Sequence, residues 1–202
     1  MKHLKEHNIL SDSQFGFGFR SQHLCESQLF VTINDIAKAM DEKLQVDAAV
    51  LDFSKAFNKI THYRLLYKLD YYGIRGNLLT WLDSFLSDHS QQVVVDGAKS
   101  STCMVTSGVP QGSVLDPILF LIYINDFVIN VQTEIWLFAD DILLYRAFKT
   151  PNDHEILQNN LNTLTKWASD WMMEFNIPKC NIIQITTITI KEILHIRCPT
   201  FH

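Results

Sequence analysis

The stretch Ile135-Trp136-Leu137-Phe138-Ala139-Asp140-Asp141-Ile142-Leu143-Leu144-Tyr145 places two adjacent carboxylates inside an apolar run. Both flanks are short and apolar, as is typical of β-strands, so the acidic pair is predicted to lie at the turn of a β-hairpin. Two like charges held so close repel each other, and partial burial strengthens the repulsion. A divalent cation would relieve it, and oxygen-only ligands favour Mg²⁺ or Mn²⁺ over zinc. An exposed Asp-Asp turn is the alternative interpretation, because turns favour Asp.

The composition is that of a globular domain. The chain has 202 residues, of which 47% are hydrophobic, and this predicts one domain, with room for a small appendage. The formal net charge of −5 argues against a free-standing nucleic-acid binder, whose binding surface is usually basic. The four cysteines are far apart and form no Cys-x-x-Cys pair, which disfavours both a zinc site and a disulfide framework.

The sequence shows no segment suited to a membrane or to export. A transmembrane helix needs a run of about 18 or more apolar residues, and the sequence contains none. The first seven residues lack the apolar core of a signal peptide. We therefore expect a protein without a membrane partner, located in the cytoplasm or the nucleus.

Outward from the hairpin, apolar spacing predicts further helices and strands. Helices are expected over residues 23–43, 54–72, 77–87, 114–127 and 153–173, and strands over 46–53, 91–95, 101–106 and 181–190. One face of the helix 77–87 is expected to carry its large apolar side chains, Leu78, Trp81, Leu82 and Phe85. The alternation, with its antiparallel hairpins, predicts an α+β fold in which an antiparallel sheet has helices packed on one face.

Two further segments complete a possible site with the acidic pair. The run Leu51-Asp52-Phe53 ends an apolar strand with a carboxylate, and residues 107–113 form a glycine-containing loop before a helix. Asp52 beside Asp140 and Asp141 would give a shared carboxylate cluster. Two divalent ions about 3.5–4 Å apart in such a cluster activate an attacking hydroxyl and stabilise a leaving phosphate. The alternative for Asp52 alone is a helix N-cap.

Several stretches, taken in order, resemble one known family. They are Gln14-Phe15-Gly16-Phe17, residues 52–57, Tyr72-Gly73-Ile74, residues 107–115, residues 121–126, Phe138-Ala139-Asp140-Asp141, and residues 171–176 with Lys179-Cys180. Over residues 10–185 the chain resembles the reverse transcriptase of non-LTR (LINE-type) retrotransposons, of the jockey- and CR1-like kind. The resemblance implies a right-hand polymerase palm over residues 46–190. It also implies a partial fingers remnant over 1–45, an unplaced tail over 191–202, an absent thumb and hence a truncated chain.

The resemblance implies roles for the acidic residues and for one lysine. Asp52 and Asp140 would bind two Mg²⁺ or Mn²⁺ ions, with Asp141 adjacent and closer to the primer end. Lys179 would be the general acid for the pyrophosphate leaving group. The alternative for Lys179 is an ordinary solvated loop lysine.

The resemblance also implies residues that contact the nucleotide and the template. Phe57 would lie under the sugar of the incoming nucleotide and favour dNTP over NTP, and Phe53 would contribute a backbone contact. Gln111 and Gly112 would face the nascent base pair and the template, since glycine lets a backbone approach closely. Arg20 would meet phosphate. The alternatives are a core aromatic for Phe57 and an ordinary strand-to-helix loop for Gln111.

The chain departs from the family pattern at several positions. Asn58 stands where the family usually has Asp, Thr61 where it has Pro, His89 where it has Arg, and Asp116 where it has Gly. Asp116 adds a negative charge beside the glycine-containing loop, where it is expected to disturb the approach of nucleotide or template.

The implied function is RNA-directed DNA synthesis from dNTPs, on an RNA template with a DNA primer. We expect this chain to retain little or no processive activity. Two alternatives stay open: a non-catalytic module that binds nucleic acid or a protein, and a translated fossil without a stable fold. Metal-independent RNA binding that survives Asp140→Ala would favour the first, and a lack of cooperative unfolding would favour the second. The sequence indicates no particular oligomeric state.

Overall fold

The computed structural model describes residues 2–15, 25–87 and 89–186. The chain forms two compact units, a first unit of residues 1–54 with 125–202 and a second unit of residues 55–124. Each unit has its own buried apolar side chains, such as Leu51 and Leu144 in the first and Leu65 and Phe120 in the second. The predicted division at residues 45/46 and 190/191 is a different one and stays a prediction.

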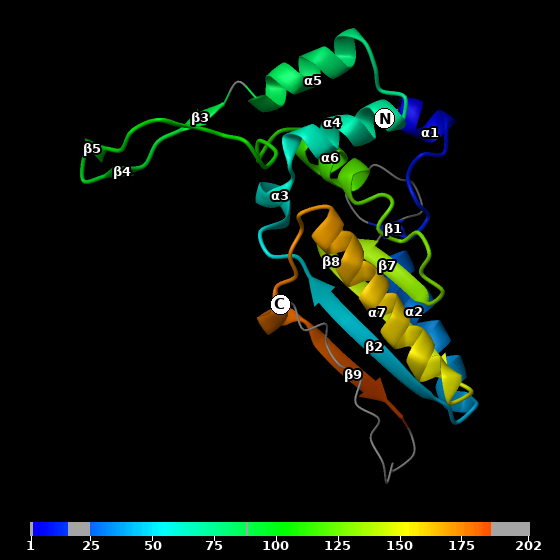
Figure 1. Cartoon of the computed structure of the whole chain (residues 1–202). Helices are drawn as coiled ribbons and strands as arrows, with labels where there is room; N and C mark the ends of the chain where they lie inside the picture. Colours follow the sequence, from blue (N-terminus) through cyan, green and yellow to red (C-terminus); the bar gives the residue numbers. More distant parts are fainter. Residues whose placement is uncertain (1, 16–24, 88, 187–202) are drawn as a thin grey trace. The chain divides into compact units, whose positions relative to one another are not determined.

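A five-stranded sheet forms the centre of the first unit (Figure 1). Its strands lie in the order β1 (Gln14–Phe15), β7 (Glu134–Phe138), β8 (Asp141–Phe148), β2 (Gln45–Asp52) and β9 (Asn181–Ile185). Neighbouring strands are antiparallel except β1 and β7, which are parallel. β2 lies between β8 and β9 and is buried along most of its length. Burial on both faces explains why its sequence is an apolar run rather than an alternating pattern.

Helices cover both faces of this sheet. The first unit contains α1 (Lys2–Glu6), α2 (Cys25–Asp41), α7 (Asn152–Asp170) and the short 3₁₀ helix η1 (Ile177–Lys179). Arg146 on β8 pairs with Asp153 of α7, whereas the adjacent Tyr145 hydroxyl donates to Asp35 of α2. Because successive side chains of a strand point to opposite faces, α7 and α2 pack on opposite sides. The predicted α+β sheet with packed helices is confirmed, and α2 on the second face is an addition to it.

The second unit consists of short helices and an extended β-arm (Figure 1). Its elements are α3 (Ala56–Lys59), α4 (His62–Tyr71), α5 (Asn77–Ser87), β3 (Ser90–Gln91), β4 (Val94–Val95), β5 (Ala98–Lys99), β6 (Cys103–Met104) and α6 (Asp116–Tyr123). β3 pairs with β6, and β4 pairs with β5. At the tip, Asp96 and Gly97 have φ values of 50° and 82°. Positive φ at both turn residues is the pattern of a type I′ hairpin turn, as the Asp-Gly pair predicts.

The predicted helix 54–72 is two helices, and the predicted helix 114–127 is shorter in the structure. α3 and α4 are separated at Ile60 and Thr61. Thr61 pairs with Ser107 in an isolated β-bridge. This bridge engages the Thr61 backbone with a distant segment, which interrupts the helical hydrogen-bond pattern.

The apolar face predicted for α5 is only partly buried in the structure. Leu82 and Leu86 are buried, with 5% and 1% of their surface exposed. Leu78 and Trp81 are 54% and 53% exposed, so they do not share the buried face of Leu82. α5 has apolar side chains on more than one side of the helix, and packing within the second unit determines which of them are buried.

The length and polarity of the described helices decide whether any of them could cross a membrane. α7 is the longest at 19 residues, and it carries Asp153, Glu155, Lys166 and Asp170 among its apolar positions. None of the described helices combines the length and the apolar character needed to cross a membrane.

Candidate active site

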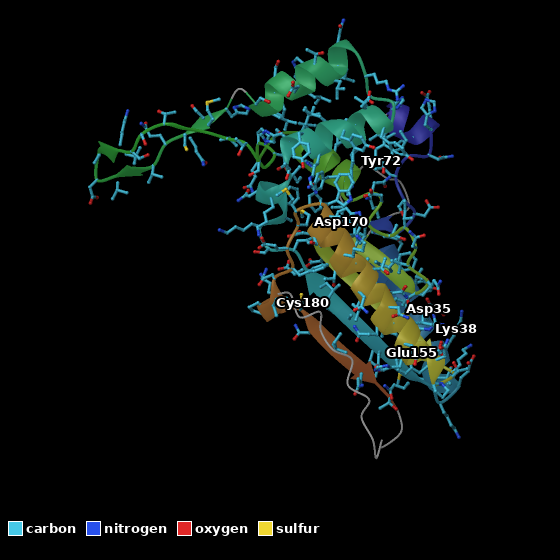
Figure 2. The ribbon with its side chains drawn as sticks, in the orientation of Figure 1. Asp35, Lys38, Tyr72, Glu155, Asp170 and Cys180 are labelled. Carbon is cyan, nitrogen blue, oxygen red and sulfur yellow. The ribbon has the colours of Figure 1, made fainter. Side chains whose placement is uncertain are left out.

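Three carboxylates lie at one end of the sheet in the first unit. β2 ends at Asp52, whose cross-strand partner is Asp141, the first residue of β8. Asp140 is the second residue of the two-residue turn between β7 and β8, directly before Asp141. The predicted hairpin around the acidic pair is therefore confirmed. In Figure 2, Cys180 marks the same end of the sheet, whereas Glu155 on α7 lies toward the opposite end.

The turn of this hairpin is strained. Ala139 has a φ of 55°, in the left-handed region that L-residues other than glycine adopt at a cost of about 1–2 kcal/mol. Such strain persists where the surrounding structure imposes it, and it clusters at functional sites. Here the ladder that pairs Phe138 with Asp141 holds both ends of the turn. The backbone immediately before Asp140 is therefore fixed in an unusual conformation.

Asp52 is the most enclosed of the three carboxylates, with 6% of its surface exposed. Lys179 Nζ lies 3.1 Å from its Oδ2, and the side-chain amide of Asn176 donates to the same oxygen at 3.1 Å. The backbone N–H of Asn176 also donates to the Asp52 carbonyl at 2.7 Å. These contacts fasten the segment after α7 to the end of β2. They bring Lys179, the predicted general acid, to the carboxylates.

The carboxylates carry more negative charge than the adjacent lysine offsets. Partial desolvation, and then the charges of Asp140 and Asp52, raise the pKa of the Asp141 carboxyl, while Lys179 opposes the rise. The hydrogen bond to Asp52, followed by the charge of that carboxylate, raises the pKa of the Lys179 ammonium. Desolvation is the largest cause of the Asp141 shift, and the part of each shift that comes from neighbouring carboxylates indicates that positive charge is stabilised here.

The donor set at this end of the sheet fits a divalent cation. Carboxylate oxygens are the ligands that Mg²⁺ and Mn²⁺ prefer, and the charges of Asp140 and Asp52 contribute to the raised pKa of Asp141, after desolvation. Within residues 2–15, 25–87 and 89–186, no three His, Cys, Asp or Glu side chains already stand in a ligating arrangement. Asp52 is engaged by Lys179 and Asn176 instead. Coordination of a cation therefore requires these side chains to rearrange.

The side chain of Phe53 belongs to the core beneath the site. Its ring stacks on Phe175, with centroids 4.9 Å apart, and meets Phe127 edge-on at 5.5 Å. Phe53 and Phe175 also form a β-bridge. With only 2% of its surface exposed, the Phe53 ring has no free face for a ligand. The predicted backbone contact from Phe53 to a nucleotide stays a prediction.

The other predicted nucleotide and template residues that the structure describes lie in the second unit. The side-chain amide of Gln111 donates to Asn58 Oδ1 at 2.9 Å, so a departure from the family pattern holds Gln111 in place. Gly112 has a φ of 83°, and no atom lies within 4 Å of the position that a Cβ would take. Phe57 stacks on Phe120 at 4.4 Å, as its core-aromatic alternative predicts, and remains partly exposed.

Asp116 modifies the loop that carries Gln111. It lies in the first turn of α6, and its carboxylate accepts a hydrogen bond from the Gly112 backbone N–H. The Asp116 N–H donates to Ser113 Oγ at 3.1 Å. Burial raises the pKa of the Asp116 carboxyl, and its Oδ1 has no hydrogen-bond partner among the described residues. The acid therefore engages a backbone donor that the loop would otherwise present to a ligand.

Replacing Gly108 with Ala is expected to lower the free energy of unfolding by about 2–3 kcal/mol. Gly108 has a φ of 90°, and an added Cβ would lie 3.1 Å from the Asn58 Cα and 3.3 Å from the Phe57 carbonyl oxygen. Gly112→Ala is the matched control, because it has the same conformational cost without the steric contact. Urea unfolding measures the free energy of unfolding of both variants. Equal losses for the two variants would contradict the close packing of the loop on α3.

The structure adds one residue to the predicted site and leaves one undescribed. Asn176 was missed as a partner of Asp52, although it lies in a quoted stretch three positions before Lys179. A polar amide in the turn after a long helix was its only sequence signal. Arg20, predicted to meet phosphate, lies outside the described residues.

Sequence comparisons give the chain a set of relatives. The family described as "Reverse transcriptase (RNA-dependent DNA polymerase)" matches residues 1–191. The RNA-directed DNA polymerase from mobile element jockey of Drosophila melanogaster is 35% identical over 176 residues, which cover 83% of this chain and 19% of that protein. The probable RNA-directed DNA polymerase from transposon BS of the same organism is 31% identical and covers 87% of this chain and 20% of that protein. The chain spans about a fifth of the length of these relatives.

Solved structures share the fold at low sequence identity. Telomerase from Candida albicans, in complex with the TWJ fragment of telomeric RNA, matches with a TM-score of 0.64 and 13% identity, over 94% of this chain and 34% of that chain. Apo telomerase from Candida tropicalis, truncated from its C-terminal domain, matches with a TM-score of 0.60 and 10% identity, over 90% and 38%. The α+β fold predicted for a partial polymerase palm is consistent with both.

Proposed function

This chain belongs to the reverse transcriptase family, and from that membership we propose that it carries the nucleotidyl-transfer centre of an RNA-directed DNA polymerase. One observation carries the proposal: Asp52 lies directly opposite Asp141 across the β2–β8 ladder, with Asp140 in the adjoining turn. Lys179, 3.1 Å from Asp52, supplies the cationic side chain that the chemistry also needs.

The proposed reaction extends a DNA primer by one nucleotide. The primer 3′-hydroxyl oxygen forms a bond to the α-phosphorus of a dNTP and passes its proton to solvent water, and the bond from that phosphorus to the pyrophosphate oxygen breaks. Two Mg²⁺ or Mn²⁺ ions, when bound, would make the attacking oxygen a stronger nucleophile and stabilise the negative charge on the leaving pyrophosphate. Asp52 and Asp140 would hold them, with Asp141 beside them. Lys179 would release Asp52 and donate a proton to the leaving pyrophosphate.

The proposed partners are an RNA template, a DNA primer and dNTPs. Phe57 would lie under the sugar of the dNTP, and Phe53 would offer it a backbone contact. Gln111 and Gly112 would face the nascent base pair and the template, and Arg20 would meet phosphate. The hydrogen bond from the Gln111 amide to Asn58 holds Gln111 in place, and the space beside Gly112 leaves room for a ligand. Both observations support a role for these two residues in template binding.

The organisation of the chain and its location are part of the same proposal. We keep residues 1–45 as a partial fingers remnant, 46–190 as the palm and 191–202 as an unplaced tail. A cytoplasmic or nuclear location is proposed because that is where an RNA template and a DNA primer are found together.

Primer extension tests the proposed function. The native chain and Asp140→Ala/Asp141→Ala are each incubated with a primed RNA template, dNTPs and Mg²⁺ or Mn²⁺. We expect the native chain to add a few nucleotides and the double variant to add at least about 100-fold fewer, because two of the three carboxylates are lost. Circular dichroism checks that both are folded. A folded native chain that adds none would contradict a catalytic role.

A second candidate function is a module that binds nucleic acid without chemistry. The ion pair between Lys179 and Asp52 favours it, because the lysine neutralises the most enclosed of the three carboxylates. RNA binding in EDTA that is unchanged by Asp140→Ala, together with no extension, would support this alternative.

A further inference from the structure

A buried histidine of the second unit lies outside the predicted site residues. His62 is the first residue of α4, and 7% of its surface is exposed. Its Nε2 lies 2.8 Å from the carbonyl oxygen of Gly108, in the glycine-containing loop 107–113. We propose that His62 is a positioning residue, which holds this loop where Gln111 and Gly112 meet the nascent base pair. The inference rests on the proposed function, which gives those two residues their role.

The chemistry of this contact determines which atom carries the proton. A carbonyl oxygen can only accept a hydrogen bond, so Nε2 of His62 is the donor. A neutral imidazole with its proton on Nε2 and an imidazolium both meet this requirement. Gly108 is buried, and a buried carbonyl group that loses its donor is unfavourable. The hydrogen bond therefore ties the position of the loop to that of α4.

Backbone contacts join the start of the loop to the same segment of the chain. The Gly108 N–H donates to the Ile60 carbonyl at 2.7 Å, and the Val109 N–H donates to the Phe57 carbonyl at 3.1 Å. With the contact from His62, both polar backbone groups of Gly108 are bonded to residues 60–62. Of these two bonds, the one to the carbonyl depends on a side chain, so a substitution can remove it.

The two residues that would meet the base pair depend on their neighbours for their position. Gln111 and Gly112 are exposed, so the anchored residues on either side largely determine where they lie. Gly108 is the anchor before them. After them, the Asp116 carboxylate accepts a hydrogen bond from the Gly112 N–H. Loss of the His62 donor would loosen the first anchor and leave the second one in place.

The proposed role predicts a particular change in kinetics. Contacts from Gln111 and Gly112 to the nascent base pair would be made in the ground state and in the transition state alike. Loss of such uniform binding raises KM and leaves kcat nearly unchanged. A variant that is merely unfolded in part contains fewer active molecules, so its kcat falls while its KM stays the same. The two parameters therefore separate positioning of the loop from a general structural role.

Three variants of the full chain test the inference by primer extension. His62→Phe keeps a ring without a donor, and His62→Gln keeps an N–H donor. His154→Phe is the matched control, because His154 Nε2 is buried without a hydrogen-bond partner among the described residues. We expect His62→Phe to raise the KM for dNTP at least about tenfold, with kcat within about threefold of the native value. The other two variants should keep the native KM within about threefold.

Hydrogen exchange, measured by mass spectrometry, gives a readout that needs no catalysis. Peptides that cover residues 105–113 should exchange at least about tenfold faster in His62→Phe than in the native chain, while peptides of α7 keep their native rates. His62→Gln should restore the native exchange. A native chain that extends no primer would contradict the proposed function, and faster exchange confined to this loop would still establish the positioning role of His62.

Four results would overturn the inference. They are unchanged exchange of the loop in His62→Phe, an equal increase in all of its peptides, equal losses in His62→Phe and His62→Gln, and a lower kcat at an unchanged KM.

Discussion

Replacing Asp52 with Asn is expected to abolish Mn²⁺ binding at the carboxylate cluster and to lower primer extension by at least about 1,000-fold. The substitution keeps the size of a side chain that is 6% exposed, and it keeps an acceptor for the Asn176 amide. It removes the negative charge that now faces Lys179 at 3.1 Å. Electron paramagnetic resonance of free Mn²⁺ reports binding, and gel analysis of the primer reports extension.

Asp47→Asn is the matched control, because Asp47 lies on the same strand and has 0% of its surface exposed. Asp47 and Asp52 are five positions apart on the strand, and an odd difference in position places their side chains on opposite faces. Mn²⁺ binding should equal that of the native chain. Equal Mn²⁺ binding by Asp52→Asn and the native chain would contradict the proposed role of Asp52.

Asp47→Asn is also expected to change the thermal stability of the chain. Burial raises the pKa of the Asp47 carboxyl, although hydrogen bonds from Gln45 and Gln184 oppose the rise. A carboxyl whose folded pKa is raised stabilises the fold at pH values below its unfolded pKa, and this contribution is lost as the pH rises through the folded value. At pH 7 the buried charge is therefore unfavourable. Asp47→Asn should unfold at a higher temperature than the native chain at pH 7, with a smaller difference near pH 4.

The acidic hairpin could be predicted because its signals are local. An apolar run on each side of Asp140 and Asp141 specifies two strands, and two charged residues between them specify the turn. The pairing of Asp52 with Asp141 joins segments far apart in the sequence. Its register depends on which strand faces are buried in the folded sheet, and local patterns do not contain that information.

The break between α3 and α4, and the burial of only some apolar side chains of α5, could not be predicted for a related reason. α5 has large apolar side chains on more than one stripe, so spacing alone could not select Leu82 and Leu86 over Leu78 and Trp81. The interruption at Thr61 arises from its bridge to Ser107, which is a long-range contact. In both cases tertiary packing decides between local options of similar free energy.

The departures from the family pattern differ in their physical consequences. Asn58 keeps a side-chain oxygen acceptor, and the Gln111 amide donates a hydrogen bond to it at 2.9 Å. Asp116 introduces a carboxylate that engages the Gly112 N–H and leaves Oδ1 without a partner among the described residues. The first substitution is compensated within the loop, whereas the second adds a half-buried carboxylate whose Oδ1 is inaccessible and unsatisfied among the described residues. Neither outcome follows from the residue types alone, because both depend on what the loop contacts.

Asp153 is expected to be the most stabilising carboxylate of the first unit. It is 5% exposed and accepts hydrogen bonds from Arg146 Nε at 2.7 Å and from the backbone N–H groups of Thr150 at 2.7 Å and Lys149 at 3.0 Å. Burial by itself raises the pKa of this carboxyl. The hydrogen bonds from Thr150, Arg146 and Lys149 outweigh burial and lower the pKa to about 2, from an ordinary value of 3.8. The ionised form is thus strongly favoured in the folded chain.

Asp153→Asn should lower the free energy of unfolding at pH 7 by about 2.5 kcal/mol, the free energy equivalent of that pKa difference. Because the folded pKa lies below the unfolded one, the unfolded chain takes up the proton first as the pH falls. The contribution is therefore complete above about pH 5 and is lost as the pH drops toward the folded pKa of about 2. Urea unfolding of both chains from pH 7 down to about 2.5 measures the difference. Glu155→Gln, an exposed carboxylate in the same first turn, should change stability by less than about 0.5 kcal/mol. A difference for Asp153→Asn that stays constant with pH would show that packing, rather than the charge, makes Asp153 important.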